Sequence, residues 1–381
     1  MQQADVDGIV ALAAELVRLP SRAGADSPDP VLRALGRWLA AHGLEPRSLT
    51  SDAGETVGLC VRVMGPEAGP ILCLDACIDT APFGDPARWS RPPTSGAIDN
   101  GRLWGRGAAD SKMGAAILAH VLRDLEATGA IRRGGVDLLL DADEHTGRVG
   151  GARAYLAALD RRPDGAVLGY PGNEELIRGS RGFHRVRLAV SGRAGHSGST
   201  DGDGINAIAK LARLVTALEE AELPAEPPGP FAFGPRVTVT RIEGGEGFSM
   251  VPDRAVCSLD MRLTPGFGIE QAGRWLDAIS ARHGAHIEPV ESWPPYLVPE
   301  THALVRAFQS AGSLAWGRDV PLAVCGPSNI GNLFAAHGIP TLCGLGVAAE
   351  NVHGTDECAL LASVDSAWRG YLEGARRFLA A

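Results

Sequence analysis

Side chains that can bind a metal ion or move a proton occur at four places in the sequence, each near the end of a predicted strand or the start of a helix. They are Cys77 and Asp79, then Asp110, then the run Asp143, Glu144 and His145, and finally His353. Because ligands in α/β proteins bind at the carboxyl ends of the strands, we expect the four places to meet at one sheet edge. Aspartate, histidine and thiolate bind Zn²⁺, and a free carboxylate can take a proton from water. The pattern indicates a metal site of the hydrolase kind.

The segment LDACIDTAP (74–82) leaves the role of its cysteine open. Asp75, Cys77 and Asp79 occupy every second position after the apolar run 71–74, so they would share one face of a strand. A thiol at that position can pack in the core, hold a metal or take part in chemistry.

Alternating apolar strands and amphipathic helices surround these residues. The expected strands are 57–64, 71–77, 136–143 and 165–171, and the expected helices are 5–19, 30–43, 114–129 and about 150–160. After 291 the alternation resumes and ends in a helix over 364–379. This order predicts an α/β fold with a mixed, largely parallel sheet and helices on both faces.

The pattern changes between 182 and 290. Residues 184–198 alternate apolar and polar side chains, which is typical of a strand with one solvated face. The order strand–helix–strand–strand–helix–strand then predicts a small α+β insertion. We therefore expect one domain made of 1–181 and 291–381, which carries the metal site, and a second domain over 182–290.

Composition excludes several classes of function. Net charge is −9 and no basic stripe occurs, which argues against nucleic acid or an anionic membrane as a partner. No apolar run reaches the roughly 20 residues that a membrane-spanning helix needs. The acidic N-terminal region lacks the basic start of a secretory signal. Seven cysteines, an odd number without short paired spacings, favour reduced thiols and a cytoplasmic location.

Several short motifs, in order, resemble the zinc-dependent exopeptidases and deacylases, the family of acetylornithine deacetylase, succinyl-diaminopimelate desuccinylase, aminoacylase and glutamate carboxypeptidase. The resemblance covers nearly the whole chain. The matching stretches are ACIDTAP (76–82), GRGAADSK (105–112), DEHTG (143–147), GYP (169–171), GRAGHS (192–197), GPSNIGN (326–332) and HGTDE (353–357).

The resemblance implies a catalytic α/β domain interrupted by an α+β lid, here 182–290, that often makes the dimer contact. The family site holds two zinc ions bridged by one aspartate, a role that falls on Asp110. His353 would be a ligand, Glu144 the general base, and Asp79 the carboxylate that orients a neighbouring ligand or the base.

The resemblance also implies residues that contact the substrate. His196, carried on the lid, would stabilise the tetrahedral oxyanion, and Arg262 would bind a substrate carboxylate. Further polar side chains that we expect at the substrate are Tyr170, Ser328, Asn329 and Asn332.

Three ligand positions depart from the family pattern. Cys77 replaces a histidine, His145 replaces a glutamate, and Tyr170 replaces an acidic residue. A neutral phenol is a poor zinc ligand, so a site made of Cys77, Asp110 and Tyr170 would hold a metal weakly or not at all. We predict one well-held zinc ion at Asp110, His145 and His353.

The expected activity is metal-dependent cleavage of the amide bond of an N-acyl amino acid or small peptide-like substrate with a free carboxylate. Two alternatives stay open. The same fold and metal can serve amide formation, acyl transfer or cyclisation, with Cys77 as a possible nucleophile. Alternatively, the chain is a metal-poor binding protein without catalysis. A homodimer formed through the lid is the expected assembly.

Overall fold

The computed structural model describes residues 4–200, 202–227 and 229–381. The chain forms two compact units: the first contains Met1–Arg178, Val298–Ala323 and His337–Ala381, and the second contains Gly179–Leu297 and Val324–Ala336. The second unit includes the whole predicted insertion and extends beyond it at 179–181 and 291–297. It also includes 324–336, a segment that the sequence pattern assigns to the other domain. This segment belongs there because Asn332 donates hydrogen bonds to the carbonyl oxygens of Arg181 and Pro294.

The first unit is built on a six-stranded sheet with the order β1-β2-β6-β3-β7-β17. The bounds are β1 Arg47–Thr50, β2 Thr56–Met64, β3 Glu67–Cys77, β6 Arg133–Asp141, β7 Gly165–Leu168 and β17 Thr341–Leu342. Strand β3 pairs in parallel with β6 and β7, and β7 with β17, whereas β1–β2 and β2–β6 are antiparallel. Residues 71–77 of β3 are buried throughout, as in a central strand that is covered on both faces. The predicted mixed, largely parallel α/β fold is confirmed.

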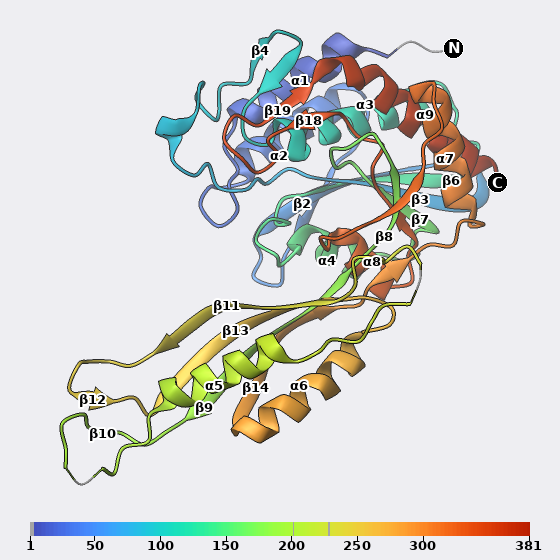
Figure 1. Cartoon of the computed structure of the whole chain (residues 1–381). Helices are drawn as coiled ribbons and strands as arrows, with labels where there is room; N and C mark the ends of the chain where they lie inside the picture. Colours follow the sequence, from blue (N-terminus) through green and yellow to red (C-terminus); the bar gives the residue numbers. More distant parts are fainter. Residues whose placement is uncertain (1–3, 201, 228) are drawn as a thin grey trace. The chain divides into compact units, whose positions relative to one another are not determined.

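Helices cover both sides of this sheet, with α1, α3 and α9 on one side and α4 on the other (Figure 1). Their bounds are α1 Val6–Arg18, α2 Asp29–Ala41, α3 Met113–Ala127, α4 Gly150–Ala157, α7 Ala303–Trp316 and α9 Val364–Ala380. Helix α3 is almost fully buried and begins with small residues. A Cβ atom at Gly114 would lie 1.9 Å from the Gly169 carbonyl oxygen, so glycine is needed where α3 packs against the end of β7.

A small sheet with the order β18-β19-β5-β4 joins two distant parts of the first unit. Its strands are β4 Ala97–Asp99, β5 Arg102–Trp104, β18 Ala349–Glu350 and β19 Cys358–Leu360. Cys358 pairs with Trp104 in an antiparallel register. This pairing places the loop 105–112, which carries Asp110, beside the loop 351–357, which carries His353.

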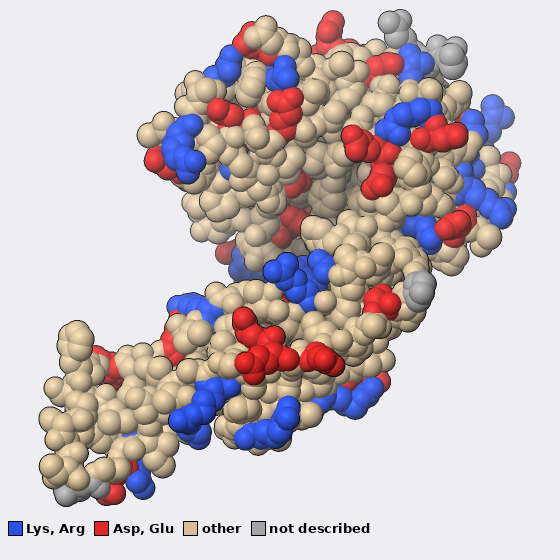
Figure 2. All heavy atoms as spheres, in the orientation of Figure 1, with Lys and Arg blue, Asp and Glu red and all other residues tan. Residues whose placement is uncertain are grey.

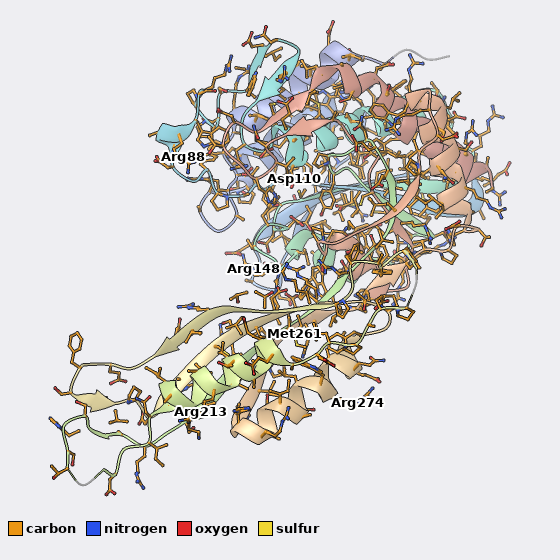
Figure 3. The ribbon with its side chains drawn as sticks, in the orientation of Figure 1. Arg88, Asp110, Arg148, Arg213, Met261 and Arg274 are labelled. Carbon is orange, nitrogen blue, oxygen red and sulfur yellow. The ribbon has the colours of Figure 1, made fainter. Side chains whose placement is uncertain are left out.

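The second unit contains a four-stranded antiparallel sheet, β11-β13-β9-β14, with helices α5 and α6 on one face (Figure 1). Bounds are β9 Gly182–Ser191, β11 Arg236–Gly244, β13 Arg254–Leu263, β14 Ala285–Trp293, α5 Ala207–Glu220 and α6 Ile269–His283. Burial alternates along β13, so Met261 faces the helices (Figure 3) while its neighbours Asp260 and Arg262 face the helix-free side. The predicted strand 184–198 ends at Ser191, and a short ladder of β10 (Gly195–His196) and β12 (Met250–Val251) follows.

The remaining strands and the remaining α-helix are short. They are β8 Leu176–Ser180, β15 Tyr296–Leu297 and β16 Leu322–Cys325, which pair in the order β15-β8-β16, and α8 Ile330–Ala336. No helix within the described part of the chain is long and apolar enough to cross a membrane. On the face that Figure 2 shows, Lys and Arg side chains alternate with Asp and Glu, without a continuous basic stripe.

Candidate metal centre and active site

Strand register brings the predicted residues of the first unit to one place. In the parallel pair β3–β6, Cys77 lies beside Asp141, so the segments that follow both strands leave the sheet together. The first carries Asp79, and the second carries Glu144 and His145. The small sheet places the loop of Asp110, just before α3 (Figure 3), beside that of His353.

Asp110, His145 and His353 bring three potential ligand atoms together. The Asp110 Oδ2 atom lies 2.8 Å from His353 Nε2 and 3.7 Å from His145 Nε2, and the two Nε2 atoms are 3.2 Å apart. Ligands that bind zinc at about 2.0–2.1 Å in a tetrahedral arrangement lie roughly 3.3 Å from one another. The oxygen and the two nitrogens therefore fit a single divalent cation.

Asp79 holds the segment that carries His145, one of the three potential ligands. It is 2 % exposed, and its two carboxylate oxygens accept backbone N–H groups, one from Glu144 (3.1 Å) and one from His145 (2.8 Å). Its Oδ1 atom also lies 3.6 Å from Nδ1 of His145. Asp79 thus holds the backbone of the segment that carries Glu144 and His145, while the imidazole Nδ1 makes no hydrogen bond to it.

Glu144 lies beside the His145 ring, at Nδ1 rather than at the proposed ligand atom Nε2, and it is not one of the three potential ligand residues. Its Oε2 atom is 3.2 Å from His145 Nδ1, and its Oε1 atom accepts a hydrogen bond of 3.2 Å from the Tyr170 hydroxyl. The side chain is 21 % exposed, so water can reach it. Burial raises the pKa of the Glu144 carboxyl, which favours proton uptake. The position suits a general base.

Cys77 is fully buried, and its Sγ atom lies 3.0 Å from Ser111 Oγ and 3.9 Å from Asp110 Oδ1. Burial raises the pKa of the thiol well above its usual value. A neutral, inaccessible thiol is a poor nucleophile, so the geometry does not favour that alternative. Cys77, Asp79 and His145 form a second set of potential ligand atoms, but the Asp79 oxygens already accept two backbone hydrogen bonds.

Tyr170 contacts the proposed base. Burial, followed by the charge of Glu144, raises the pKa of Tyr170 well above its usual value, so the phenol stays a neutral donor. This position accounts for the departure at 170: the side chain orients Glu144 through its hydroxyl.

We predict that Tyr170→Phe lowers kcat about 10- to 100-fold, because a hydrogen bond to a charged group is worth roughly 1.5–3 kcal/mol. Metal content should not change, since the phenol is not a ligand. Steady-state kinetics and metal analysis of the same preparation check both points, and loss of metal from the variant would make Tyr170 a ligand after all.

The residues expected at the substrate in the second unit have structural partners. Asn332 is fully buried; its amide donates to the carbonyl oxygens of Arg181 and Pro294, and its Oδ1 accepts from Asn329 N and Ser180 Oγ. Since both ends of the amide are engaged with the protein, the expectation that Asn332 contacts substrate is corrected: it holds a turn in place.

Ser328 and Asn329 lie in the same turn. The Ser328 hydroxyl donates to the Arg181 carbonyl oxygen at 2.7 Å and accepts from Arg262 at 3.3 Å. Asn329 Oδ1 accepts from Gly331 N at 2.8 Å. Arg262 is also held by Asp260, with Nε 2.7 Å from Oδ1. Here Ser328 orients Arg262, and Asn329 stabilises the turn.

His196 and Arg262 lie toward opposite ends of the second unit. Arg262 pairs with Phe183, and β9 continues to Ser191 before the chain reaches His196 on β10 (Figure 1). From Phe183 to Ser191 the strand advances eight residues at about 3.3 Å each, so the two ends of β9 are roughly 26 Å apart. The structure does not bring these two predicted residues together, so one chain cannot present both to one small substrate.

Sequence reasoning missed Arg106 and Glu357, which are buried within the loops that carry Asp110 and His353. Arg106 lies in GRGAADSK and Glu357 ends HGTDE, so both are inside motifs that were identified for their neighbours Asp110 and His353. Because both motifs were expected at the same metal site, their other charged side chains could have been considered as partners. No spacing rule, however, indicated that Arg106 and Glu357 would pair.

Comparisons with known proteins show the family of the chain. Residues 73–375 match the family described as peptidase family M20/M25/M40. A succinyl-diaminopimelate desuccinylase of Alkalilimnicola ehrlichii is 28% identical over 86% of this chain and 88% of its own length. An acetylornithine deacetylase of Erwinia tasmaniensis is 27% identical over 77% and 80%. The crystal structure of an M20 family metallo-carboxypeptidase from Sulfolobus solfataricus superimposes with a TM-score of 0.82 over 98% of this chain and 99% of that chain, at 17% identity.

Proposed function

Because the chain belongs to peptidase family M20/M25/M40, we propose that it hydrolyses the amide bond of an N-acyl amino acid or small peptide-like substrate with a free carboxylate. The names of the two relatives, a desuccinylase and a deacetylase, denote enzymes that remove an acyl group from an amino acid. These names support the proposed substrate class. The observation that carries the proposal is the triangle of ligand atoms from Asp110, His145 and His353, together with the Glu144 carboxylate beside the His145 ring.

A divalent cation at the triangle would polarise the scissile carbonyl and lower the pKa of a water molecule. Glu144 takes a proton from the attacking water as the new C–O bond forms. It returns that proton to the leaving nitrogen as the C–N bond breaks. Tyr170 holds one oxygen of Glu144, and Asp79 holds the backbone N–H groups of Glu144 and His145.

Arg262 is the proposed contact for the substrate carboxylate. Its guanidinium is oriented by Asp260 and Ser328, and Arg181 and Arg236 are close enough to interact electrostatically. Asp260 also pairs with Arg185. Four arginines near one aspartate leave a net positive charge, which suits a carboxylate that an arginine fork can bind.

We propose zinc as the metal, with one ion per chain. Two of the three altered positions have other partners: the Cys77 thiol contacts Ser111 Oγ, and the Tyr170 hydroxyl bonds Glu144. Both contacts support the proposal that a second metal-binding position is weak or absent.

We further propose a homodimer through the second unit. The separation of His196 from Arg262 supports this assembly, because a second copy can bring its own His196 to a substrate that Arg262 of the first copy binds. Phe248 and Met250 are exposed near His196, where β12 pairs with β10, and β11 is an edge strand of the sheet. All seven cysteines are free, which supports the proposed cytoplasmic location.

The function is tested by incubating zinc- or cobalt-loaded protein with a panel of N-acetyl and N-succinyl amino acids and measuring the released amine. Amine release supports hydrolysis. Product that forms only with an added amine would instead indicate amide formation or acyl transfer. Thermal stabilisation by the compounds without turnover would indicate a binding protein.

A further inference from the structure

A buried ion pair lies between the two loops that carry Asp110 and His353. Arg106 and Glu357 are both buried, and Arg106 NH1 is 2.6 Å from Glu357 Oε2. The other carboxylate oxygen, Oε1, accepts three backbone N–H groups of the Asp110 loop: Gly107 at 3.0 Å, Ala109 at 3.1 Å and Asp110 at 3.2 Å. One side chain therefore fixes the backbone of the proposed metal-binding aspartate.

The second arm of the guanidinium reaches the histidine loop. Arg106 NH2 donates to the His353 carbonyl oxygen at 3.1 Å, and the guanidinium lies 5.2 Å from the ring centre of Trp89. His353 has a φ of +62°, in the left-handed region that residues other than glycine seldom occupy. Its side chain is 54 % exposed, so packing around the imidazole is limited. A backbone in this conformation persists when neighbouring contacts hold it there.

We propose that Arg106 and Glu357 are positioning residues that set the distance between Asp110 and His353 before the metal binds. One arm of the Arg106 guanidinium donates to Glu357, whose carboxylate holds the Asp110 loop. The other arm donates to the carbonyl oxygen of His353 and so holds the His353 loop. A cation held by few ligands binds tightly only when those ligands are fixed at the required spacing. The inference rests on the proposed metal site and adds the device that preorganises it.

Two variants that conserve charge each cut one connection. Arg106→Lys keeps a cation for Glu357 but loses the fork that also reaches His353. Glu357→Asp keeps an anion for Arg106, but the shorter side chain cannot reach all three N–H groups. The matched control is Arg102→Lys, because Arg102 makes a similar two-armed pair with Glu350, at 2.9 and 3.4 Å, but on the surface and without contact to either ligand loop.

The experiment measures zinc affinity of the full chain by competition with a chromophoric chelator, together with the melting temperature of metal-free protein. We expect each of the first two variants to bind zinc 10- to 100-fold more weakly, a range typical for loss of groups that orient ligands, and Arg102→Lys to match the wild type.

Wild-type affinity in both Arg106→Lys and Glu357→Asp would overturn the inference. An equal loss of affinity in Arg102→Lys would also overturn it, because the effect would then be general destabilisation. If the wild-type chain itself binds no zinc, cobalt or manganese, the proposed metal site fails, and that result is distinct from the first two.

Discussion

Glu144→Gln should lower kcat about a thousandfold while the protein keeps its metal, because a positioned general base contributes typically 10²–10⁴-fold. Glutamine matches glutamate in size, and its carbonyl oxygen can still accept the Tyr170 hydroxyl. It cannot take a proton from water. The substitution therefore removes the proposed chemistry and leaves the surrounding contacts.

The measurement is steady-state amine release by wild type and variant, with metal content determined for each. Glu126→Gln, at an exposed position on α3, is the matched control and should behave like the wild type. Turnover by Glu144→Gln within tenfold of wild type would take the role of base away from Glu144. Loss of metal from this variant would make Glu144 a ligand.

The second large effect is complementation between two inactive variants. His196→Ala should lose about 10²–10³-fold in kcat if the imidazole stabilises the oxyanion, and Glu144→Gln is inactive for the reason given above. If His196 serves the site of a second copy, a mixed dimer has one intact site, with Glu144 from one chain and His196 from the other. Random reassortment then restores roughly a quarter of the wild-type activity.

The two proteins are mixed at equal concentration, allowed to exchange subunits and assayed over time. The control mixture is Glu144→Gln with Asp110→Ala. Both changes lie in the first unit, where no exchange of residues between copies is proposed, so this mixture should stay inactive. Stable mixed dimers without recovered activity would show that His196 does not act across the dimer.

The fold and the proposed metal site were largely predictable because they depend on local signals. The apolar runs 71–77 and 136–143 read as buried strands, and parallel pairing alone then brings Asp79 and Glu144 to the same sheet edge. The residues Asp110 and His353 could be placed there because each lies in a motif whose order along the chain is distinctive.

Other features depend on contacts that no sequence pattern reports. The separation of His196 from Arg262 follows from the register of β9 on β13, which was not readable from either strand alone. Asn332 looks like a polar group in an exposed turn, yet its amide is consumed by Arg181 and Pro294, far away in the sequence. The pairing of Arg106 with Glu357 spans 251 residues. In each case the partner is set by tertiary structure.

The central claim is that one cation is held by Asp110, His145 and His353. It is tested most directly by anomalous diffraction at the zinc edge from crystals grown with zinc. A single peak in the protein within bonding distance of Asp110 Oδ2 and of Nε2 of both histidines is the predicted result. Two peaks of similar height, or a single peak beside Cys77 and Tyr170 instead, would contradict the claim.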